Sequence, residues 1–522
     1  MLGNQVFSDL QLDSLHSHFT FCTKWGQTAF TKGLQNTTSD PKVIKKRQLG
    51  LLALKTETSA LQTIHSSLAC CSVSACTVDT LLAPADSLAS ESISQVLFSK
   101  TSTGAFLNTN SWALNGIITW RTIVLPGISI LFPFLAVVLP FILLKFLNAK
   151  ISGIEYLEKI KGLILNQISV PSFLKAKHSS DRIGFLLESC FIGLTLAIFI
   201  SSLWNQVISA LHLRTITSTI SEQGQHILDV LKCGKQIIKT LEALPPRKRL
   251  ALRGLYSEGE RALKACERFN GCTPLTAFGT SWNSMEGLAE ISEWLGKVDV
   301  YVTLAQSSVC FPRICSNGLS IKGIYHPGLE KMVRNDFATE GHSILTGPNR
   351  GGKSTFCKAV GLALVTAQSW GFAWCESMKW KPFDAIYSAL EPVGRLGIAS
   401  TFEAEIEFAK SVLAIPENGS SFVMMDEIFH STNATDGVSA SQVFLSQLYK
   451  KPRTISLIST HYKELTEMFK ESAKCIMMDA HDGQNGKLIY SYKVTDGVST
   501  KSSVMEILYE RGLHPGARLA VF

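Results

Sequence analysis

The stretch S-I-L-T-G-P-N-R-G-G-K-S-T, from Ser343 to Thr355, decides the fold of the C-terminal part of the chain. It contains the phosphate-binding loop pattern Gly347-x-x-x-x-Gly352-Lys353-Ser354, directly after a short apolar run. The residues that follow, Phe356 to Gln368, are mostly apolar and rich in alanine, as in a buried helix. A strand, a glycine loop and a helix in this order are the context that the motif needs. The alternative is a Gly-Lys turn that only joins two elements.

The residues of this loop suit a nucleotide with its magnesium ion. Glycines without a Cβ let backbone N–H groups curl around phosphate oxygens, and the start of the following helix adds the positive end of its dipole. Lys353 supplies a point charge to the outer phosphates, and the Ser354 hydroxyl is a ligand for Mg²⁺. We therefore expect ATP and Mg²⁺ as cofactors. The residues expected to hold the nucleotide are Gly347, Pro348, Asn349, Arg350, Gly351, Gly352, Lys353, Ser354 and Thr355.

A second apolar stretch, Phe422 to Met425, ends in the two carboxylates Asp426 and Glu427. An aspartate at a strand end can hold Mg²⁺ opposite the serine of the loop, and the next glutamate can orient or deprotonate the attacking water. The alternative is an exposed acidic turn. A further stretch, Thr454 to Ser459, leads to His461, whose neutral imidazole could contact the terminal phosphate. A lone histidine at a strand end is, however, more often structural.

The 522-residue chain is apolar for a soluble nucleotide-binding protein. Hydrophobic residues make up 46% of it and charged residues 18%, which suggests membrane segments. The formal charge of +8 would suit nucleic acid or anionic lipid, but no run of Lys and Arg exceeds three residues, so an ordinary basic surface is an equal alternative. The 13 scattered cysteines lack C-x-x-C pairs and favour free thiols and no zinc site. The polar start, Met1 to Leu10, predicts no signal peptide.

Two apolar segments, 122–144 and 189–211, contain no charged residue. Each is 23 residues long, enough to cross a hydrocarbon core of about 30 Å as a helix. Trp112, Trp120 and Trp204 lie near their ends, where amphipathic rings favour the membrane interface. We therefore expect two transmembrane helices that form a hairpin, and two buried core helices of a soluble fold are the alternative.

Proline and charge complicate a simple pair of crossings. Pro126, Pro133 and Pro140 recur every seven residues and would kink a helix on one face, so a re-entrant or interfacial hairpin is an alternative. The loop between the segments is rich in lysine, and the positive-inside rule would place it in the cytoplasm. An ATP-binding domain also needs the cytoplasm, yet two crossings put both ends of the chain opposite the loop. We expect a membrane-associated chain whose ATP-binding domain faces the cytoplasm. A hairpin that enters the membrane without crossing it would leave both this domain and the lysine-rich loop on the cytoplasmic side.

The rest of the chain has mainly helical patterns. The run from Thr23 to Leu51 predicts helices broken at Asp40-Pro41, where Asp can cap and Pro can occupy the first turn. Apolar residues recur at helical spacing after Ser221, and Pro245-Pro246 breaks that run. Ile321 to His326 looks like a strand that leads towards the phosphate loop.

These motifs, in this order, resemble the ATPase domain of the MutS family over about residues 319–515. More faintly, Thr23 to Gln48 is similar to the start of the helical core of that family, and Val300 to Pro312 to its end. The segments that carry the resemblance are the phosphate loop, Y-H-P-G-L at Tyr325–Leu329, N-D at Asn335–Asp336, S-T-F-E-A-E-I-E at Ser400–Glu407, M-D-E-I at Met425–Ile428, S-T-H-Y-K-E-L at Ser459–Leu465 and Y-K-V-T-D-G at Tyr492–Gly497.

The resemblance implies an ABC-type α/β P-loop ATPase fold that works as a homodimer. Each nucleotide would lie between the phosphate loop of one chain and the segment Ser400-Thr401-Phe402 of the other. It also implies roles for single residues: Lys353 on phosphate, Ser354 and Asp426 on Mg²⁺, Glu427 on the hydrolytic water, His461 on the γ-phosphate, Ser400 on the nucleotide of the second chain and Tyr492 on one face of the adenine.

The chain departs from the pattern of the family in several places. Phe429, His430 and Ser431 replace the glycines and arginine usual after the acidic pair, and Met332 stands where an adenine-stacking aromatic is expected. No mismatch-reading domain precedes the helical core, and the first hundred residues hold no Phe-x-Glu wedge. The apolar block stands where the lever helices and DNA clamp of the family would be. The ATPase interpretation is therefore firmer than the mismatch-repair interpretation.

We expect four regions: a helical core-like region at 1–110, the membrane hairpin at 111–214, a helical return of the lever and core at 215–318 and the ATPase domain at 319–522. The first functional hypothesis is a membrane-associated MutS-like ATPase whose nucleotide-driven dimer engages mismatched or branched double-stranded DNA in repair. The alternative is a membrane ATPase that no longer binds DNA and uses dimerisation for transport, gating or scaffolding. Retention of both Asp426 and Glu427 argues against a scaffold that does not hydrolyse ATP.

Overall fold

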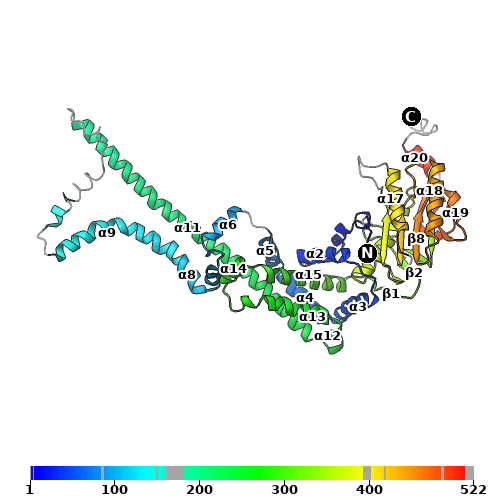
Figure 1. Cartoon of the computed structure of the whole chain (residues 1–522), viewed down its shortest axis with the longest axis horizontal. Coiled ribbons are helices and arrows are strands. Elements are labelled where there is room, and N and C mark those ends of the chain that lie inside the picture. The colour runs from blue at the N-terminus through cyan, green and yellow to red at the C-terminus, as the bar shows by residue number, and fades with distance from the viewer. Residues whose placement is uncertain are drawn as a thin grey trace. The chain divides into compact units, whose positions relative to one another are not determined.

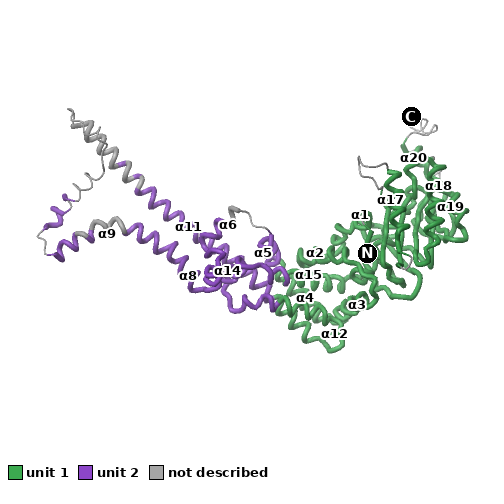
Figure 2. Tube along the Cα trace, in the orientation of Figure 1, with its two compact units in different colours: residues 1–72, 233–262, 291–522 green, residues 73–232, 263–290 purple. Residues whose placement is uncertain are grey.

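In a computed structural model the chain forms two compact units, each assembled from separate stretches of sequence (Figure 1, Figure 2). Unit 1 comprises residues 1–72, 233–262 and 291–522, and unit 2 comprises residues 73–232 and 263–290. The residues that the structure describes are 2–3, 5–83, 87–147, 151–156, 158–159, 181–391, 401–416, 419–483 and 487–511.

Unit 1 holds the strands and most of the shorter helices. Its helices, of which α13 and α15 extend into unit 2, are α1 (Val6–Asp9), η1 (Leu12–His18), α2 (Lys24–Gln35), α3 (Pro41–Lys55), α4 (Thr58–Cys70), α12 (Pro246–Ala251), α13 (Arg253–Ala265), α15 (Glu286–Gln306), α16 (Lys353–Ser369), α17 (Thr401–Leu413), α18 (Ala434–Leu448), α19 (Lys463–Met468) and α20 (Val504–Glu510). Its strands are β1 (Arg313–Ile314), β2 (Leu319–Ile324), β3 (Asn335–Thr339), β4 (His342–Thr346), β5 (Ser377–Trp380), β6 (Ala385–Ala389), β7 (Ser421–Met425), β8 (Thr454–Ser459), β9 (Ala473–Asp482) and β10 (Leu488–Asp496).

The larger sheet has the strand order β10-β9-β4-β8-β7-β6. Its strands pair in parallel, except for the antiparallel pair of β9 and β10. Because β4, β8 and β7 are adjacent and parallel, the segments that follow them emerge at the same edge of the sheet, where α/β folds bind their ligands. The smaller sheet has the order β1-β5-β2-β3. The α/β organisation predicted for the C-terminal region is confirmed.

Several local predictions are also confirmed. The apolar runs before the acidic pair and before His461 are the fully buried strands β7 and β8. Between α2 and α3, the side chain of Asp40 accepts a hydrogen bond from the Lys42 N–H at 2.8 Å, and Pro41 occupies the first turn of α3. The break at Asp40-Pro41 therefore follows from capping chemistry.

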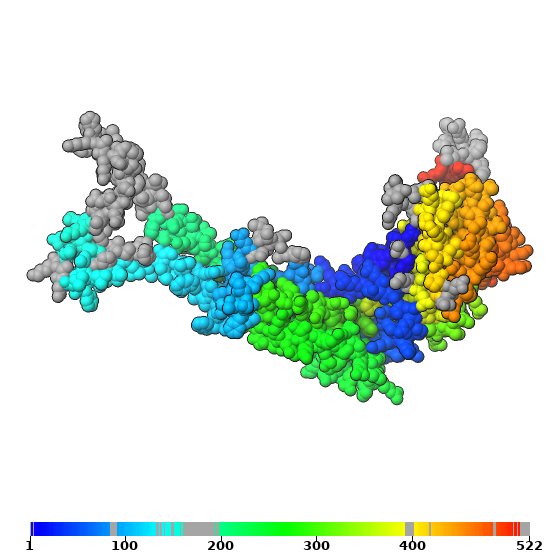
Figure 3. Space-filling model, in the orientation of Figure 1, coloured from blue at the N-terminus to red at the C-terminus, as the bar shows by residue number. Residues whose placement is uncertain are grey.

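The N-terminal segment of unit 1 packs on the edge of the larger sheet. Leu2 forms a parallel bridge with Ile386 of β6, so the chain start extends the sheet by one short strand-like segment. Asp9 is buried and accepts hydrogen bonds from the Ser388 hydroxyl at 2.6 Å and the Leu390 N–H at 3.0 Å. In Figure 3 these first residues, in dark blue, lie directly against the yellow surface of the sheet domain. The first residues of the chain therefore hold the backbone where β6 ends.

Unit 2 is helical and contains both apolar segments. Its helices are α5 (Ser72–Leu82), α6 (Ser87–Ser94), α7 (Ser102–Thr109), α8 (Ser111–Thr119), the π-helical turn η2 (Trp120–Val124), α9 (Leu125–Phe146), most of α11 (Asp181–Glu242), η4 (Glu267–Phe269) and α14 (Pro274–Asn283). Segment 122–144 lies in η2 and α9, and segment 189–211 lies in α11, so both are helical as expected. Residues 160–180, with several of the loop lysines, are outside the described residues.

The predicted kinks do not interrupt α9, which runs from Leu125 to Phe146 across all three prolines and curves gently (Figure 1). Pro126 lies in the first turn of α9, where a missing N–H costs least. Within the described residues, one helical stretch, Ser111–Leu131, is long and apolar enough to cross a membrane, and little of it is buried. Length and composition alone are weak evidence for a crossing, so the two transmembrane helices remain a prediction.

One prediction about stability concerns His342 at the start of β4. Its ring is buried, stacks on Tyr449 with a centroid distance of 4.2 Å and places Nδ1 2.9 Å from the Ser456 hydroxyl. Burial lowers the pKa of His342 to about 4. Between about pH 6.5 and 4 the unfolded chain therefore binds a proton that the folded chain does not, so stability falls as the pH falls through this window. The expected loss is about 3 kcal/mol.

Denaturant unfolding at a series of pH values checks this. The variant His342→Gln keeps a group able to reach Ser456 but cannot titrate, so its unfolding free energy should vary less between about pH 6.5 and 4. Equal pH dependence in the two proteins would contradict the assignment.

Candidate functional site

The phosphate loop joins β4 to α16 and has the backbone shape that its glycines permit. Gly352, at the N-cap of α16, has φ +97°, and a Cβ placed there would lie 3.2 Å from the Tyr492 ring and 3.3 Å from Met478. Arg350 also has a left-handed φ of +65°, and its guanidinium bonds Glu510 on α20 at 2.6 Å. The loop is therefore closely covered by β9, β10 and the C-terminal helix, which makes glycine necessary at 352.

Lys353 lies inside the loop. Its side chain is buried, and Nζ donates hydrogen bonds to the carbonyl oxygens of Gly347 at 3.1 Å and Pro348 at 3.4 Å. Nζ is also 3.2 Å from Nε2 of His461. Burial lowers the pKa of the Lys353 ammonium, and the charges of Glu427 and Asp426 oppose that shift. A buried cation of this kind gains favourable interactions when an anion enters the loop.

The acidic pair after β7 is held by the strand next to it. The Ser459 hydroxyl, at the end of β8, donates to Asp426 Oδ1 and accepts from the backbone N–H of Glu427 at 2.9 Å. Glu427 Oε1 is 2.9 Å from Nε2 of His461, and this hydrogen bond lowers the pKa of Glu427 while burial opposes the shift. Lys353, His461 and Glu427 thus form one continuous chain of polar contacts between the phosphate loop and the carboxylate.

A cavity of about 590 Å³ opens over this chain of contacts. Residues 349–355 and Glu427 line part of it. The rest of the lining mixes aromatic and apolar side chains, such as Tyr325, Leu329 and Tyr492, with polar and charged ones. A cavity of this size that joins a phosphate-binding loop to aromatic and apolar side chains fits a nucleoside triphosphate.

A smaller cavity of about 240 Å³ adjoins the first and shares Ser354 and Glu427 with it. Asp426, Glu405 and His430 also line this space. A hydroxyl and carboxylates are the oxygen ligands that Mg²⁺ prefers, and Mg²⁺ is usually held by few protein groups together with substrate phosphates. In the described part of the chain, no three His, Cys, Asp or Glu side chains gather closely enough to hold a metal alone. The residues present therefore fit a magnesium ion that enters with the nucleotide.

The loop after the acidic pair is unusual because two non-glycine residues adopt left-handed backbone angles. Glu427 has φ +50° and Phe429 has φ +48°, a conformation that costs roughly 1 kcal/mol for a residue with a Cβ. The Phe429 ring is buried, and its centroid lies 6.0 Å from that of Phe402 on α17 and 6.0 Å from that of Phe444 on α18. The Phe429 carbonyl also accepts a hydrogen bond from the Tyr462 hydroxyl at 3.1 Å. Packing of the ring offsets the strained backbone.

The two polar residues that follow in this loop contact a buried carboxylate. Glu405 on α17 is buried, accepts a hydrogen bond from the Ser431 hydroxyl at 2.7 Å and lies 3.3 Å from Nδ1 of His430. These contacts give the substituted loop a second attachment to α17. Sequence reasoning noted His430 and Ser431 as departures but did not identify Glu405 as their partner.

The structure brings together most of the site residues expected from the sequence. Residues 349–355, Glu427 and Tyr492 line the larger cavity, Gly347 and Pro348 bond Lys353, and Asp426 and His461 lie beside it. Ser400 lies outside the described residues, so its role is unchanged as a prediction. Met332 is exposed and is not among the described residues that line the cavity.

Sequence reasoning missed Tyr325, Asn335 and Ser459 as contributors to the site. Tyr325 supplies an aromatic ring to the cavity. Asn335 donates to the Tyr492 carbonyl at 3.0 Å and accepts from the Val494 N–H at 2.8 Å, which fixes the irregular register of β10. The available signal was that each of the three is the first residue of a segment that carries the resemblance to the MutS family.

Comparisons with known proteins identify the same region. A family model described as MutS domain V matches residues 343–513. The protein named DNA mismatch repair protein MutS of Thermotoga maritima is 32% identical over 243 residues, which cover 44% of this chain and 30% of that protein. Proteins of the same name from Thermus aquaticus and Lactobacillus delbrueckii subsp. bulgaricus are 32% and 30% identical over 238 and 244 residues. The chain thus aligns with less than a third of the length of these relatives.

Proposed function

We propose that the chain, whose residues 343–513 match MutS domain V, is a membrane-associated MutS-like ATPase that hydrolyses ATP between two copies of itself. The observation that carries this proposal is the contact chain of Lys353, His461 and Glu427, which joins the phosphate loop to a carboxylate along a cavity of nucleotide size. The relatives are DNA mismatch repair proteins by name. We extend the ATPase activity to this chain and consider two candidates for its partner: double-stranded DNA, or a membrane without DNA.

Each residue of the site has a separate role in the proposed hydrolysis. The Lys353 ammonium holds the outer phosphates, and its burial strengthens that interaction. The hydrogen bond to His461 lowers the pKa of Glu427, so this carboxylate stays ionised at neutral pH and can accept a proton from the attacking water. Ser354 and Asp426 would hold Mg²⁺, which when bound neutralises charge on the phosphates. From the family resemblance we assign Ser400 to the nucleotide bound by the second copy.

The surface of unit 2 supports the membrane part of the proposal. Large apolar side chains of η2, α9 and α11 are exposed along both helices, including Ile123, Leu131, Leu143, Ile200 and Leu211. An exposed apolar surface of this extent needs lipid or another protein to cover it. DNA binding, by contrast, depends on cations placed against phosphates. This surface therefore favours the second candidate, a membrane ATPase that has lost DNA binding, over a clamp that grips DNA with these helices.

One experiment tests both candidates on the full chain in detergent or lipid nanodiscs. Mg²⁺-dependent ATP hydrolysis is expected in either case, and its absence would remove the ATPase proposal. Binding of duplex DNA that weakens steeply between about 50 and 200 mM salt would support a role on DNA, since phosphate contacts release counterions. No binding at the lower salt would leave the membrane ATPase. Release of the protein from membranes by a carbonate wash would contradict integral membrane association.

A prediction about positioning concerns Ser459. The variant Ser459→Ala removes the donor to Asp426 and leaves the Glu427 N–H without its acceptor, each at a cost of about 1 kcal/mol. We expect steady-state ATP turnover to fall about tenfold, with a smaller change in nucleotide affinity because the phosphate loop is untouched. The variant Ser459→Thr keeps the hydroxyl and should retain turnover. Full activity of Ser459→Ala would show that the acidic pair needs no support from β8.

A further inference from the structure

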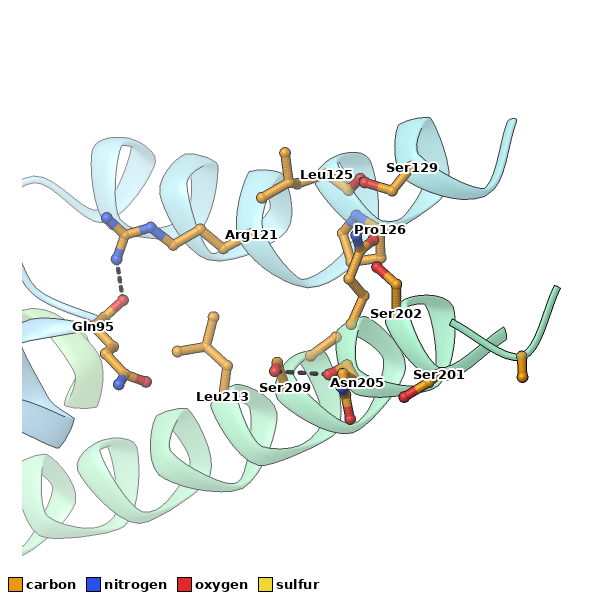
Figure 4. Close-up of a pocket in the computed structure, with 13 residues that line it drawn as sticks. Gln95, Arg121, Leu125, Pro126, Ser129, Ser201, Ser202, Asn205, Ser209 and Leu213 are labelled. Atoms are coloured by element: carbon orange, nitrogen blue, oxygen red, sulfur yellow. Dashed lines mark hydrogen bonds between the residues drawn. The ribbon is translucent and has the colours of Figure 1, made fainter. Parts of the chain in front are cut away.

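A groove of about 1030 Å³ runs between the helices η2 and α9 on one side and α11 on the other, inside unit 2 (Figure 4). It lies outside the nucleotide site and plays no part in the mechanism above. Small and polar side chains line much of it, and those used below are Arg121, Ser129, Ser202, Asn205, Gln206 and Ser209. The volume is at the upper end of what ligand-binding cavities commonly have.

Polar side chains are found between the two helices of this pair. Apolar side chains such as Ile130, Leu131 and Ile208 are exposed and do not line the groove, whereas Ser129 of α9 and the serines and amides of α11 line it together with apolar residues such as Leu125. In Figure 4, Ser129 of α9 and Ser202, Asn205 and Ser209 of α11 lie along the facing sides of the two helices. A hairpin surrounded by lipid would place its polar groups in this way, between the helices.

One cation stands at the end of the groove. Arg121 is the only ionisable residue among the described residues that line it. The π-helical turn η2 carries Arg121, and one of its five N–H donors bonds the Gln95 carbonyl. The remaining donors can bind a phosphate group bidentately, which a guanidinium does well. Exposed Trp112 and Trp120 lie close to Arg121 in sequence, as expected at the depth of lipid headgroups.

An amide at the surface of the groove also suits a ligand. The Oε1 atom of Gln206 is buried, so a ligand does not reach it, whereas Asn205 is exposed and lines the groove. The side-chain amide of Asn205 can both donate and accept hydrogen bonds, so it can bond a hydroxyl of a bound molecule. A ligand that meets both groups therefore carries a phosphate for Arg121 and a hydroxyl for Asn205.

We infer that the groove binds the headgroup of an anionic phospholipid with a hydroxylated headgroup, such as phosphatidylglycerol. Its phosphate pairs with Arg121, its headgroup hydroxyls bond Asn205 and the neighbouring serines, and its acyl chains pass beside Leu125 and Pro126 into the surrounding lipid. This inference rests on the proposed membrane association.

The test uses the full chain in nanodiscs of phosphatidylcholine that contain a minor fraction of phosphatidylglycerol. Native mass spectrometry of the ejected protein should show phosphatidylglycerol retained in preference to phosphatidylcholine. The variant Arg121→Gln should lower this retention about tenfold. Arg214→Gln is the matched control, because Arg214 is an exposed cation on α11 that does not line the groove, and it should retain the lipid.

A second variant separates the headgroup from the phosphate. Asn205→Leu should still retain anionic lipid but lose the preference for phosphatidylglycerol over phosphatidic acid, which lacks the headgroup hydroxyls. Displacement of the lipid by free glycerol phosphate would show that the site takes a soluble phosphate, and equal loss in Arg121→Gln and Arg214→Gln would overturn the site. If the wild-type protein fails to float with phosphatidylcholine vesicles, the membrane association itself is wrong, and this result is independent of the two variants.

Discussion

Nucleotide affinity is expected to fall at least about 100-fold when Lys353 is replaced by methionine. The Lys353 Nζ lies inside the phosphate loop, between two loop carbonyls and His461, and in the proposed function it is the cation that meets the outer phosphates. Charge-assisted hydrogen bonds of this kind are worth about 1.5–3 kcal/mol each, and more than one forms when phosphate enters. Methionine fills the same space without the charge. Equilibrium binding of a fluorescent ATP analogue measures the effect.

The same change should not destabilise the free protein. Burial leaves the Lys353 ammonium poorly solvated before the nucleotide binds, and this lowers its pKa. An apolar side chain removes that penalty, so the unfolding free energy without nucleotide should be equal or higher in Lys353→Met. Lys379→Met, at an exposed position on β5, is the control and should bind nucleotide normally. Retained nucleotide binding in Lys353→Met would refute the assignment of the site.

The second large effect is expected for Glu427→Gln. This variant removes the proton acceptor while it keeps the shape of the loop, and general-base catalysis contributes roughly 100-fold to 10,000-fold. We expect turnover to fall by about 100-fold or more with nucleotide affinity nearly unchanged, so that the ATP-bound dimer accumulates. Steady-state turnover and sedimentation with Mg²⁺-ATP measure the two effects. Glu464→Gln, exposed on α19, should leave both unchanged.

The pH dependence of turnover follows from the contact with His461. The hydrogen bond lowers the pKa of Glu427, so the carboxylate is present above that pKa and is lost as the pH falls through it. In His461→Ala the pKa of Glu427 should rise, and the acid limb of the turnover profile should move to higher pH. An acid limb at the same pH in both proteins would show that another group sets it.

The strands that lead to the phosphate loop, the acidic pair and His461 could be predicted because a short apolar run in the sequence is enough to identify each one. β8 has the predicted bounds, Thr454 to Ser459, since a fully buried strand is a continuous apolar run that ends at polar residues. The break between α2 and α3 could be predicted for the same reason, because Asp40 and Pro41 are adjacent in the sequence. Asp426 and Glu427 could be placed because they follow such a strand directly, and Lys353 because the glycine pattern after β4 fixes its position.

Other parts of the site depend on contacts between residues far apart in the sequence. Asn335 fixes Tyr492 through bonds across two strands, and nothing near either residue specifies that pairing. The link between Glu405 and Ser431 likewise appears only when α17 packs beside the loop. Asp9 bonds Ser388, which is 379 residues away in the sequence. Such contacts are set by the packing of the fold and leave no periodic pattern.

For the two apolar segments, the sequence predicts the secondary structure but not whether they cross a membrane. Their helical state follows from length and composition, and the structure contains helices there. Composition cannot distinguish a crossing from an apolar hairpin that lies along a surface or against a partner. The polar lining of the groove, with Arg121 at its end, is information that only the relative arrangement of two helices within unit 2 could supply.

Phe429 alters how the acidic loop can respond to its surroundings. A glycine at a left-handed position allows a loop to sample several shapes at little cost, whereas an aromatic ring wedged between α17 and α18 holds one shape. A shift of α17 would therefore displace this ring. Because Phe429 is two residues after Glu427, the backbone of Glu427 would move with it. α17 begins at Thr401, directly after Ser400 in the sequence, so in the proposed dimer the approach of a second copy at Ser400 would shift the backbone of Glu427.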